Sequence, residues 1–317
     1  MAAPGEFDLI RTYFQRPLAD AGVRLGIGDD AALLALPPGE ELAVTTDTLV
    51  AGHHFPDTAA PFDIGWKALA VNLSDLAAMG ARARWVTLAL TLPASDEAFL
   101  GEFARGFFAL AEREGVALVG GDTTRGPLSI TVTAMGTVPA GQALRRAGAR
   151  AGDEVYVSGT VGDAGLGLRL ELGQWPEALD VAAQALALAR LHRPEPRLAL
   201  GLALRGLATA GLDVSDGLAQ DLGHLLAASG VGAELELSAL PRSPALAGID
   251  TAFADILALT SGDDYELLFT APAAARAAIA ALPLPCARIG IITAAAGLRF
   301  RRDGAAIDMP VAGFTHF

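Results

Sequence analysis

Helix-forming and strand-forming segments alternate along this 317-residue chain, and this alternation constrains its fold most strongly. Helical periodicity predicts helices at residues 7–21, 63–79 and 97–114, the last with Ser95 or Asp96 as its N-cap. Strands are predicted between them, at residues 42–46, 85–92, 117–119 and 129–138. We therefore expect an α/β fold class with mixed, α+β-like sheets.

A polar, Arg- and Gly-rich stretch at residues 141–152 is predicted to separate two domains, 1–140 and 141–317. A chain of 317 residues exceeds the usual size of a single core, which also favours two domains. The alternation continues after the boundary, with predicted strands at residues 154–158, 233–237, 265–270 and 288–292. Both halves are therefore expected to be globular.

Short motifs place aspartates beside Gly, Thr or Ser: GIGDD, TTDT, NLSD, GGDTT, DVSDG and SGDDYE. Carboxylates and hydroxyls suit Mg²⁺, which commonly shares its ligands with substrate phosphates, whereas zinc requires clusters of Cys and His. The chain has one Cys and five His. The motifs therefore predict bound Mg²⁺ rather than zinc.

Two of these motifs are predicted to stand at strand ends, where α/β sheets bind ligands. Thr45, Thr46 and Asp47 end the predicted strand 42–46. Gly121 and Asp122 close the strand 117–119, where a glycine lets a phosphate or metal approach the backbone. Both motifs are therefore predicted to face a ligand cleft.

Asn72 and Asp75 share one face of an otherwise apolar helix, where a buried carboxylate needs a partner such as a metal. A solvated polar stripe is the alternative. Asp29 and Asp30 fit a simple turn whose side chains bond local amides. Asp216 fits the N-cap of a helix starting at Gly217, an interpretation that leaves Asp213 unexplained.

Net charge and residue types exclude several classes of function. A formal charge of −13 disfavours nucleic acid and anionic membranes as partners. Lys67 is the only lysine, so neither a Walker A loop nor a Tyr-xxx-Lys arrangement is present. A single cysteine, Cys286, and the lack of a signal-like or 18-residue apolar run predict a cytoplasmic protein.

Gly159, Gly162 and Gly165 follow a predicted strand and open a helical stretch, as in a dinucleotide-binding loop, but their spacing is GxxGxxG. Glycines at a helix start are the simpler interpretation. An NAD(P)-dependent reductase stays an alternative on this loop. His54 lies in the Gly-flanked AGHHF loop near the proposed cleft and is a candidate for substrate contact.

Seven motifs in this order, GIGDDAA, TTDTLVAGHHF, ALAVNLSDLAAMGA, LVGGDTTRGP, LDVSDGL, SGDDYELLFT and GFTHF, resemble the thiamine-monophosphate kinase family over nearly the whole chain. The resemblance implies the aminoimidazole ribonucleotide synthetase-like superfamily. Its expected fold has two α/β domains, and the N-terminal domains of two copies pair into a dimer β-barrel. Another superfamily enzyme with a different phosphate acceptor stays an alternative, as does a non-catalytic metal-binding module.

The resemblance also implies a reaction, in which ATP phosphorylates thiamine monophosphate to thiamine diphosphate with several Mg²⁺ ions. It implies metal ligands at Asp30, Thr45, Thr46, Asp47, Asp75, Asp122, Asp213 and Asp216. It implies ATP contacts at Gly121, Asp122, Arg146 and Ser215, and substrate contacts at His54, Asp263 and Phe314. The family usually has Glu at the position of Asp263 and Trp or Tyr at that of Phe314.

The chemistry of the acceptor predicts that no side chain acts as an acid or base. The acceptor oxygen belongs to a phosphate whose second pKa is about 6, so it is largely ionised near neutral pH. Positioning and charge neutralisation by Mg²⁺ are then expected to supply the catalysis.

Overall fold

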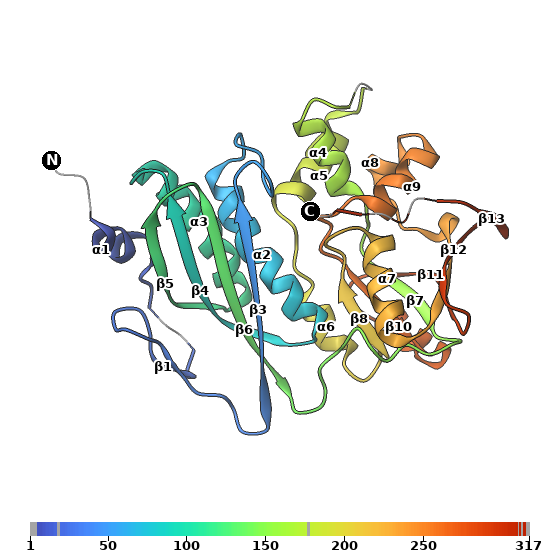
Figure 1. Ribbon diagram of the computed structural model, residues 1–317, viewed down its shortest axis with the longest axis horizontal. Helices are drawn as coiled ribbons and strands as arrows, with labels where there is room; N and C mark the ends of the chain where they lie inside the picture. The colour runs from blue at the N-terminus through green and yellow to red at the C-terminus, as the bar shows by residue number, and fades with distance from the viewer. Residues whose placement is uncertain (1–4, 18–19, 176–177, 310, 312, 315–317) are drawn as a thin grey trace. The chain divides into compact units, whose positions relative to one another are not determined.

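The computed structural model describes residues 5–17, 20–175, 178–309, 311 and 313–314 of the chain (Figure 1). It divides into two compact units, which we describe separately. Unit 1 comprises Met1–Leu76 and Ala81–Gly141, and unit 2 comprises Ala77–Gly80 and Gln142–Phe317. Within the described residues, no helix is long and apolar enough to span a bilayer.

Unit 1 is built on a four-stranded sheet of order β3-β6-β4-β5, in which β4 and β5 are parallel and the other pairs antiparallel. Its elements are α1 (Glu6–Leu9), the π-helix η1 (Ile10–Phe14), β1 (Val23–Leu25), β2 (Leu33–Leu34), β3 (Glu40–Val50), α2 (Pro61–Ala78), β4 (Arg82–Leu92), α3 (Glu97–Glu114), β5 (Ala117–Arg125) and β6 (Ser129–Pro139). β1 and β2 form a separate antiparallel pair.

The helices α2 and α3 lie side by side (Figure 1) and touch through glycines. A Cβ on Gly65 would stand 2.1 Å from the carbonyl oxygen of Phe103, and one on Gly106 would stand 1.9 Å from that of Phe62. The predicted helix 97–114 is confirmed, with Asp96 as an N-cap that accepts the N–H groups of Ala98 and Phe99.

Among the predicted elements of unit 1, one helix and two strands differ most in length from the structure. The helix predicted at 7–21 ends at Phe14, since Gln15 is already extended, and Pro17 keeps it from resuming because a proline disfavours the helical conformation of the residue before it. Residues 18–19 of that prediction lie outside the described residues. β3 and β5 continue well beyond the predicted 42–46 and 117–119. β3 pairs with β6 along its whole length, from Glu40 opposite Pro139 to Val50 opposite Ser129, and this pairing outweighs the local polar sequence.

Unit 2 has a seven-stranded sheet of order β13-β12-β9-β11-β7-β10-β8, whose neighbours are antiparallel except β9 and β12. Its strands are β7 (Glu154–Ser158), β8 (Ala210–Asp213), β9 (Gly232–Glu236), β10 (Leu267–Ala271), β11 (Cys286–Thr293), β12 (Gly297–Arg302) and β13 (Ala305–Ile307). Its helices are α4 (Asp163–Glu171), α5 (Val181–His192), α6 (Leu198–Leu204), α7 (Leu218–Ser229), η2 (Leu237–Ala239), α8 (Pro244–Ala247), α9 (Thr251–Thr260), η3 (Ala273–Ala275) and α10 (Arg276–Ala280).

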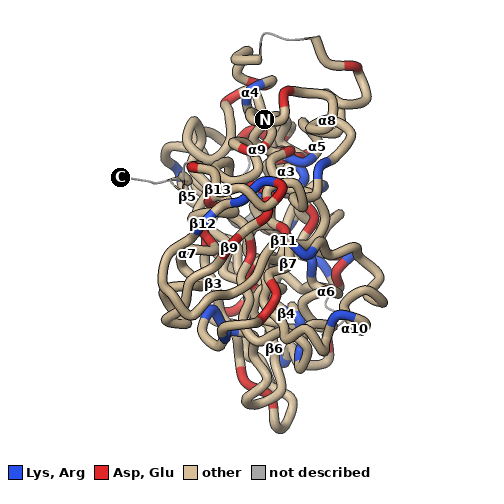
Figure 2. Tube along the Cα trace, turned by 90° about the vertical axis from the view of Figure 1, so that its right-hand side faces the viewer, with Lys and Arg blue, Asp and Glu red and all other residues tan. Residues whose placement is uncertain are grey.

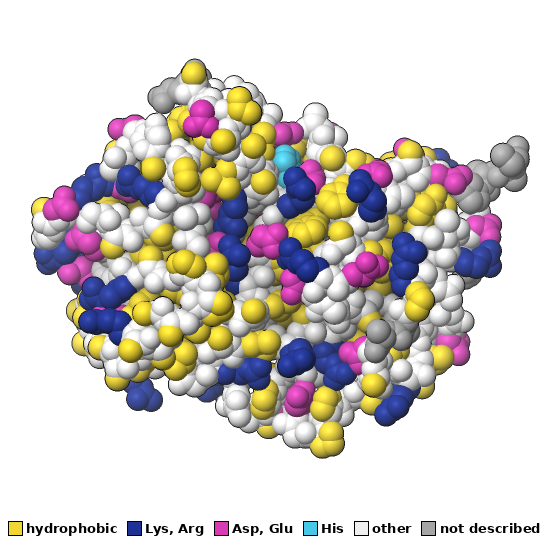
Figure 3. All heavy atoms as spheres, turned by 180° about the vertical axis from the view of Figure 1, so that it is seen from behind, with side chains coloured by type: hydrophobic (Ala, Val, Ile, Leu, Met, Phe, Trp, Pro, Cys, Tyr) yellow, Lys and Arg dark blue, Asp and Glu magenta, His cyan; other side chains and the backbone are white. Residues whose placement is uncertain are grey.

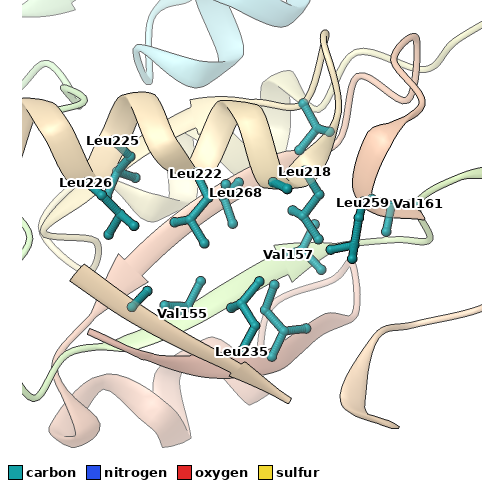
Figure 4. Close-up of a cluster of buried hydrophobic side chains, with 14 of the residues drawn as sticks. Val155, Val157, Val161, Leu218, Leu222, Leu225, Leu226, Leu235, Leu259 and Leu268 are labelled. Carbon is teal, nitrogen blue, oxygen red and sulfur yellow. The ribbon is translucent and has the colours of Figure 1, made fainter. Parts of the chain in front are cut away.

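The main core of unit 2 lies between this sheet and α7. Figure 4 shows Leu222 and Leu226 of α7 directed towards Val155 on β7. Leu222 and Val155 are fully buried. This packing fixes the helix that begins next to the DVSDG motif, so the first turn of α7 is a rigid base for that loop.

Candidate functional site

Four residues of the motifs in unit 1 meet where α2 runs along the edge strand β3: Thr45, Asp47, Asn72 and Asp75. The Thr45 hydroxyl donates to the carboxylate of Asp75, and the backbone N–H of Asp47 donates to Oδ1 of Asn72 at 3.0 Å. The Nδ2 of Asn72 donates in turn to the carbonyl of Ala68 at 3.1 Å. Asn72 therefore pairs an edge-strand amide while α2 presents Asp75 to the same strand.

Thr45 and Asp47 lie on one face of β3, because side chains two apart on a strand point the same way. Thr46 points to the other face, where its hydroxyl lies 2.9 Å from that of Thr133. The prediction that Thr45–Asp47 end a strand is wrong, because all three lie in the middle of the 11-residue β3. Their side chains therefore cannot all face one ligand.

Asp122 lies at the opposite edge of the sheet from Asp47. Asp47 is opposite Val132 on β6, Val132 opposite Leu88 on β4, and Leu88 opposite Gly121 on β5. Three strand spacings of about 4.8 Å separate the two edges, or about 14 Å. Gly121 and Asp122 lie inside β5 rather than at its end, so that prediction is also wrong.

Gly121 has no room for a side chain. Its φ is 148°, and a Cβ there would lie 1.8 Å from the carbonyl oxygen of Leu88. This glycine is explained by the close approach of β4, in addition to any role towards a ligand.

Three other predicted residues lie in loops or turns. Asp30 is exposed in a turn where Asp29 Oδ1 accepts its N–H at 2.9 Å, which is the local-turn interpretation. His54 follows β3, and its Nδ1 accepts the N–H of Val50 at 3.0 Å, so its Nε2 carries the proton of the neutral ring. Arg146, in unit 2, is exposed, and its carbonyl accepts a bond from Ser229 Oγ at 3.1 Å.

In unit 2 the DVSDG and SGDDYE loops are joined through their backbones. The N–H of Asp263 donates to the carbonyl of Ser215 at 2.9 Å, and that of Tyr265 to the carbonyl of Val214 at 2.8 Å. Asp263 and Tyr265 have φ values of 68° and 50°, a left-handed conformation that costs free energy outside glycine. Two motifs about fifty residues apart in sequence thus form one surface.

The C-terminal segment joins the same surface. The N–H of Phe314 donates to the carbonyl of Asp216 at 2.9 Å, and the Phe314 side chain stays 46% exposed. Asp213, at the end of β8, is 6% exposed. Unit 2 therefore brings together the five candidates of its DVSDG, SGDDYE and GFTHF motifs: Asp213, Ser215, Asp216, Asp263 and Phe314.

Asp221 was missed by the sequence analysis. Its Oδ2 accepts the N–H groups of Ser215, Asp216 and Gly217 at 3.0, 3.0 and 3.2 Å. Burial raises the pKa of this carboxyl to about 6. The N-cap interpretation of Asp216 is wrong, because Gly217 occupies that position. An acidic residue in the first turn of a helix, just after a Gly-rich loop, was the available signal.

Glu266 occupies the space beside the GxxGxxG loop. A Cβ on Gly159 would lie 2.2 Å from its Oε1. Glu266 is fully buried and accepts bonds from Ser158 Oγ at 2.5 Å and from Arg190 and Arg197 at 2.7 and 2.8 Å. Gly159 therefore makes room for the Glu266 carboxylate, while Gly162 and Gly165 lie against Ala258 and Ser261, so close packing within unit 2 explains all three glycines without a dinucleotide. The geometry disfavours the reductase alternative.

The donor atoms of these motifs are oxygens, the kind of ligand that suits Mg²⁺. Among the described residues, no group of three or more His, Cys, Asp or Glu side chains converges on one point. Mg²⁺ is usually held by one or two carboxylates and completed by water and substrate phosphates. Paired oxygen donors, such as the Thr45 hydroxyl beside Asp75, meet that requirement.

Charged side chains are spread well beyond these motifs. Figure 2 shows acidic residues along the trace of both units. On the face drawn in Figure 3, basic and acidic side chains are interspersed among the described residues. The candidate site residues therefore differ from other charged residues in the contacts they make, and not in the density of charge around them.

Family models match both halves of the chain. Residues 28–138 match the N-terminal domain of AIR synthase related proteins, and residues 150–303 match the C-terminal domain. The fold and its paired loops therefore define a protein of the AIR synthase related class.

Curated and solved relatives narrow this class. The chain is 51% identical to thiamine-monophosphate kinase of Salmonella typhimurium over 245 residues, covering 77% of this chain and 75% of the relative. The crystal structure of thiamine-monophosphate kinase from Stenotrophomonas maltophilia has a TM-score of 0.84 and 52% identity, covering 92% and 94% of the two chains. AaThiL complexed with AMPPCP and TMP has a TM-score of 0.78 and 32% identity, covering 89% of each. The chain belongs to the thiamine-monophosphate kinase family.

Proposed function

We propose that this protein phosphorylates thiamine monophosphate to thiamine diphosphate with ATP. Curated relatives that are 51% identical over 77% of this chain are thiamine-monophosphate kinases, and one solved relative holds AMPPCP, an ATP analogue, together with TMP. The observation that carries the proposal within this structure is the joining of the DVSDG, SGDDYE and C-terminal segments into one surface of unit 2. That surface combines carboxylates with an exposed aromatic ring.

The reaction needs little acid or base chemistry from the protein. A phosphate oxygen of thiamine monophosphate attacks the γ-phosphorus of ATP, a new P–O bond forms, and the bond to ADP breaks. Since the attacking oxygen is already ionised, no proton has to be removed. His54, whose Nδ1 is engaged by Val50, is assigned to substrate contact.

The proposed ligands of Mg²⁺ all offer oxygen: Asp30, Thr45, Thr46, Asp47, Asp75, Asp122, Asp213 and Asp216. Bound Mg²⁺ would neutralise the phosphates of both substrates. The carboxylate of Asp75 is oriented by the Thr45 hydroxyl, and Asp47 is held in the middle of a fully paired strand. Thr46 points away from Thr45, so its side chain or its carbonyl must serve a different ligand position from Thr45.

The remaining contacts divide between the two substrates. We assign Gly121, Asp122, Arg146 and Ser215 to ATP. We assign His54, Asp263 and Phe314 to thiamine monophosphate. Asp263 is one methylene shorter than the usual Glu, and Phe314 lacks the polar group of Trp or Tyr. Both still supply what a thiazolium cation prefers, a carboxylate and an aromatic face.

Incubation with thiamine monophosphate and MgATP should yield thiamine diphosphate and ADP in equal amounts. Chromatography of both products over a time course checks this result, and omission of thiamine monophosphate is the control. ADP and free phosphate without thiamine diphosphate would contradict the proposed acceptor and favour another enzyme of the class.

Phe314→Ala and Asp263→Asn should raise the KM for thiamine monophosphate and leave the KM for MgATP nearly unchanged. Loss of one cation–π or charge contact predicts an increase of about five- to thirtyfold. Asn is chosen at position 263 because it tolerates the left-handed backbone there, which Ala would strain. Steady-state kinetics with each substrate varied separately measures both constants, and equal increases in the two would remove the assignment.

We also propose that two copies pair through the sheet of unit 1. Leu42 and Val44 of β3 are 44% and 56% exposed, on the sheet face that also carries the Thr46–Thr133 and Thr48–Thr131 hydroxyl pairs. Exposed apolar residues on an edge strand favour association. Sedimentation should give twice the chain mass of 32.4 kDa, and a monomer at micromolar concentration would contradict the proposal.

A further inference from the structure

The side-chain amide of Gln220 holds the C-terminal segment by two hydrogen bonds. Its Oε1 accepts the N–H of Gly313 at 2.9 Å, and its Nε2 donates to the carbonyl of Phe314 at 2.9 Å. The N–H of Phe314 bonds the carbonyl of Asp216, also at 2.9 Å. Three bonds therefore connect residues 313–314 to the DVSDG loop and the start of α7.

The segment lies directly on that loop. A Cβ on Gly313 would be 2.1 Å from the carbonyl oxygen of Asp216 and 3.1 Å from Cβ of Gln220. Only glycine fits at position 313. Because it has no side chain, its backbone lies close enough to α7 for its N–H to donate to the Gln220 amide. The Phe314 side chain remains 46% exposed beside this backbone clamp.

The base of the clamp is rigid. Gln220 stands in the first turn of α7, between the buried Ala219 and Asp221. Asp221 holds the backbone of residues 215–217 by three hydrogen bonds, while Leu218 and Leu222 are fully buried in the core. The backbone of Gln220 is therefore fixed with α7, and its side-chain amide is held by its two bonds to residues 313–314.

A primary amide suits this role because it donates and accepts at the same time. A carboxylate in its place would accept from Gly313 but face the Phe314 carbonyl with a second acceptor. We propose that Gln220 is a positioning residue for the phosphate acceptor, which acts by holding the Phe314 ring at the place where the thiamine moiety binds. This inference rests on the proposed function and adds a residue that none of the sequence motifs indicated.

Gln220→Ala should raise the KM for thiamine monophosphate about tenfold, as expected for two lost hydrogen bonds, and change the KM for MgATP less than twofold. Gln220→Glu should show most of the same increase. Gln184→Ala is the matched control, because Gln184 Nε2 also bonds a backbone carbonyl, that of Leu179, at 2.8 Å. Equal increases in both KM values would overturn the proposal. Gln220 Nε2 also lies 3.5 Å from Asp216 Oδ2, so such a result would mean that Gln220 supports the DVSDG loop and not the Phe314 ring.

A double-mutant cycle tests whether Gln220 acts through the ring. In a Phe314→Ala background, Gln220→Ala should leave the KM for thiamine monophosphate unchanged within twofold, because the ring that it positions is absent. Additive effects would overturn the proposal. Hydrogen exchange of a C-terminal peptide containing Gly313 and Phe314 should speed up in Gln220→Ala alone, and faster exchange with an unchanged KM would likewise overturn it.

Failure of the proposed function gives a different result. If the wild-type protein forms no thiamine diphosphate, calorimetric titration with thiamine monophosphate decides the role of Gln220. About tenfold weaker binding in Gln220→Ala with unchanged Gln184→Ala supports the positioning role, and equal binding, or none in the wild type, overturns it.

Discussion

Asp75→Asn is expected to lower kcat by about 10²- to 10³-fold, the range found when one electrostatic contact to a transition state is removed. The change preserves the size of the side chain but removes its negative charge. In the wild type, the Asp75 carboxylate on α2 accepts the hydroxyl of Thr45 on β3. The Asn carbonyl can still accept the Thr45 hydroxyl, so the fold should persist. Steady-state kinetics over a range of Mg²⁺ concentrations, with a circular dichroism melt, measures both effects.

Asp63→Asn is the matched control, because Asp63 stands in the first turn of the same helix. It should change kcat less than twofold, and its effect should fall on helix stability through the helix dipole. Wild-type turnover in Asp75→Asn, or an equal loss in Asp63→Asn, would remove Asp75 from the proposed metal site. Recovery of part of the rate at high Mg²⁺ would indicate weakened metal binding.

Glu266→Gln is expected to lower the free energy of unfolding by about 3–5 kcal/mol, because it leaves two guanidinium groups without their shared carboxylate. Glu266 is fully buried, and the side chains of Arg190 and Arg197 are 12% and 19% exposed. Gln keeps the volume, so the loss reports the missing charge and not a cavity. Urea unfolding followed by circular dichroism measures the change.

Glu102→Gln is the matched control on the surface, where Glu102 pairs with Arg105 and the side chains are 50% and 63% exposed. It should hardly change the unfolding midpoint, because solvent screens an exposed pair. A similar loss in both variants would show that burial does not set the strength of the Glu266 network. Because β10 starts right after Glu266, a destabilised variant should also loosen the SGDDYE loop.

Local signals predicted several elements well. The helix 97–114 with its Asp96 cap and the strand 154–158 appear with the predicted bounds. Periodicity and capping depend on residues within one or two turns, so they can be read without the fold. The ordered aspartate motifs are also local, and they predicted the thiamine-monophosphate kinase family, to which the chain belongs.

Long-range pairing was not predicted. β3 runs through Thr45–Asp47 and β5 through Gly121 and Asp122, because ladder bonds to β6 and β4 outweigh the local turn signals. The opposite faces of Thr45 and Thr46, and the two strands, β6 and β4, that lie between Asp47 and Asp122, follow from that pairing.

The sequence by itself determined which chemical groups this protein has and in what order: oxygen donors of the kind that suits Mg²⁺, a short acidic residue at 263 and an aromatic one at 314. Tertiary structure alone decided which of them meet. Backbone bonds across about 50 and 100 residues join Asp263 and Phe314 to the Ser215–Asp216 loop, and Asp221, Gln220 and Glu266 likewise gain their roles from tertiary contacts. Hydrogen bonds between distant segments depend on how sheets pair and helices pack, which no local pattern encodes.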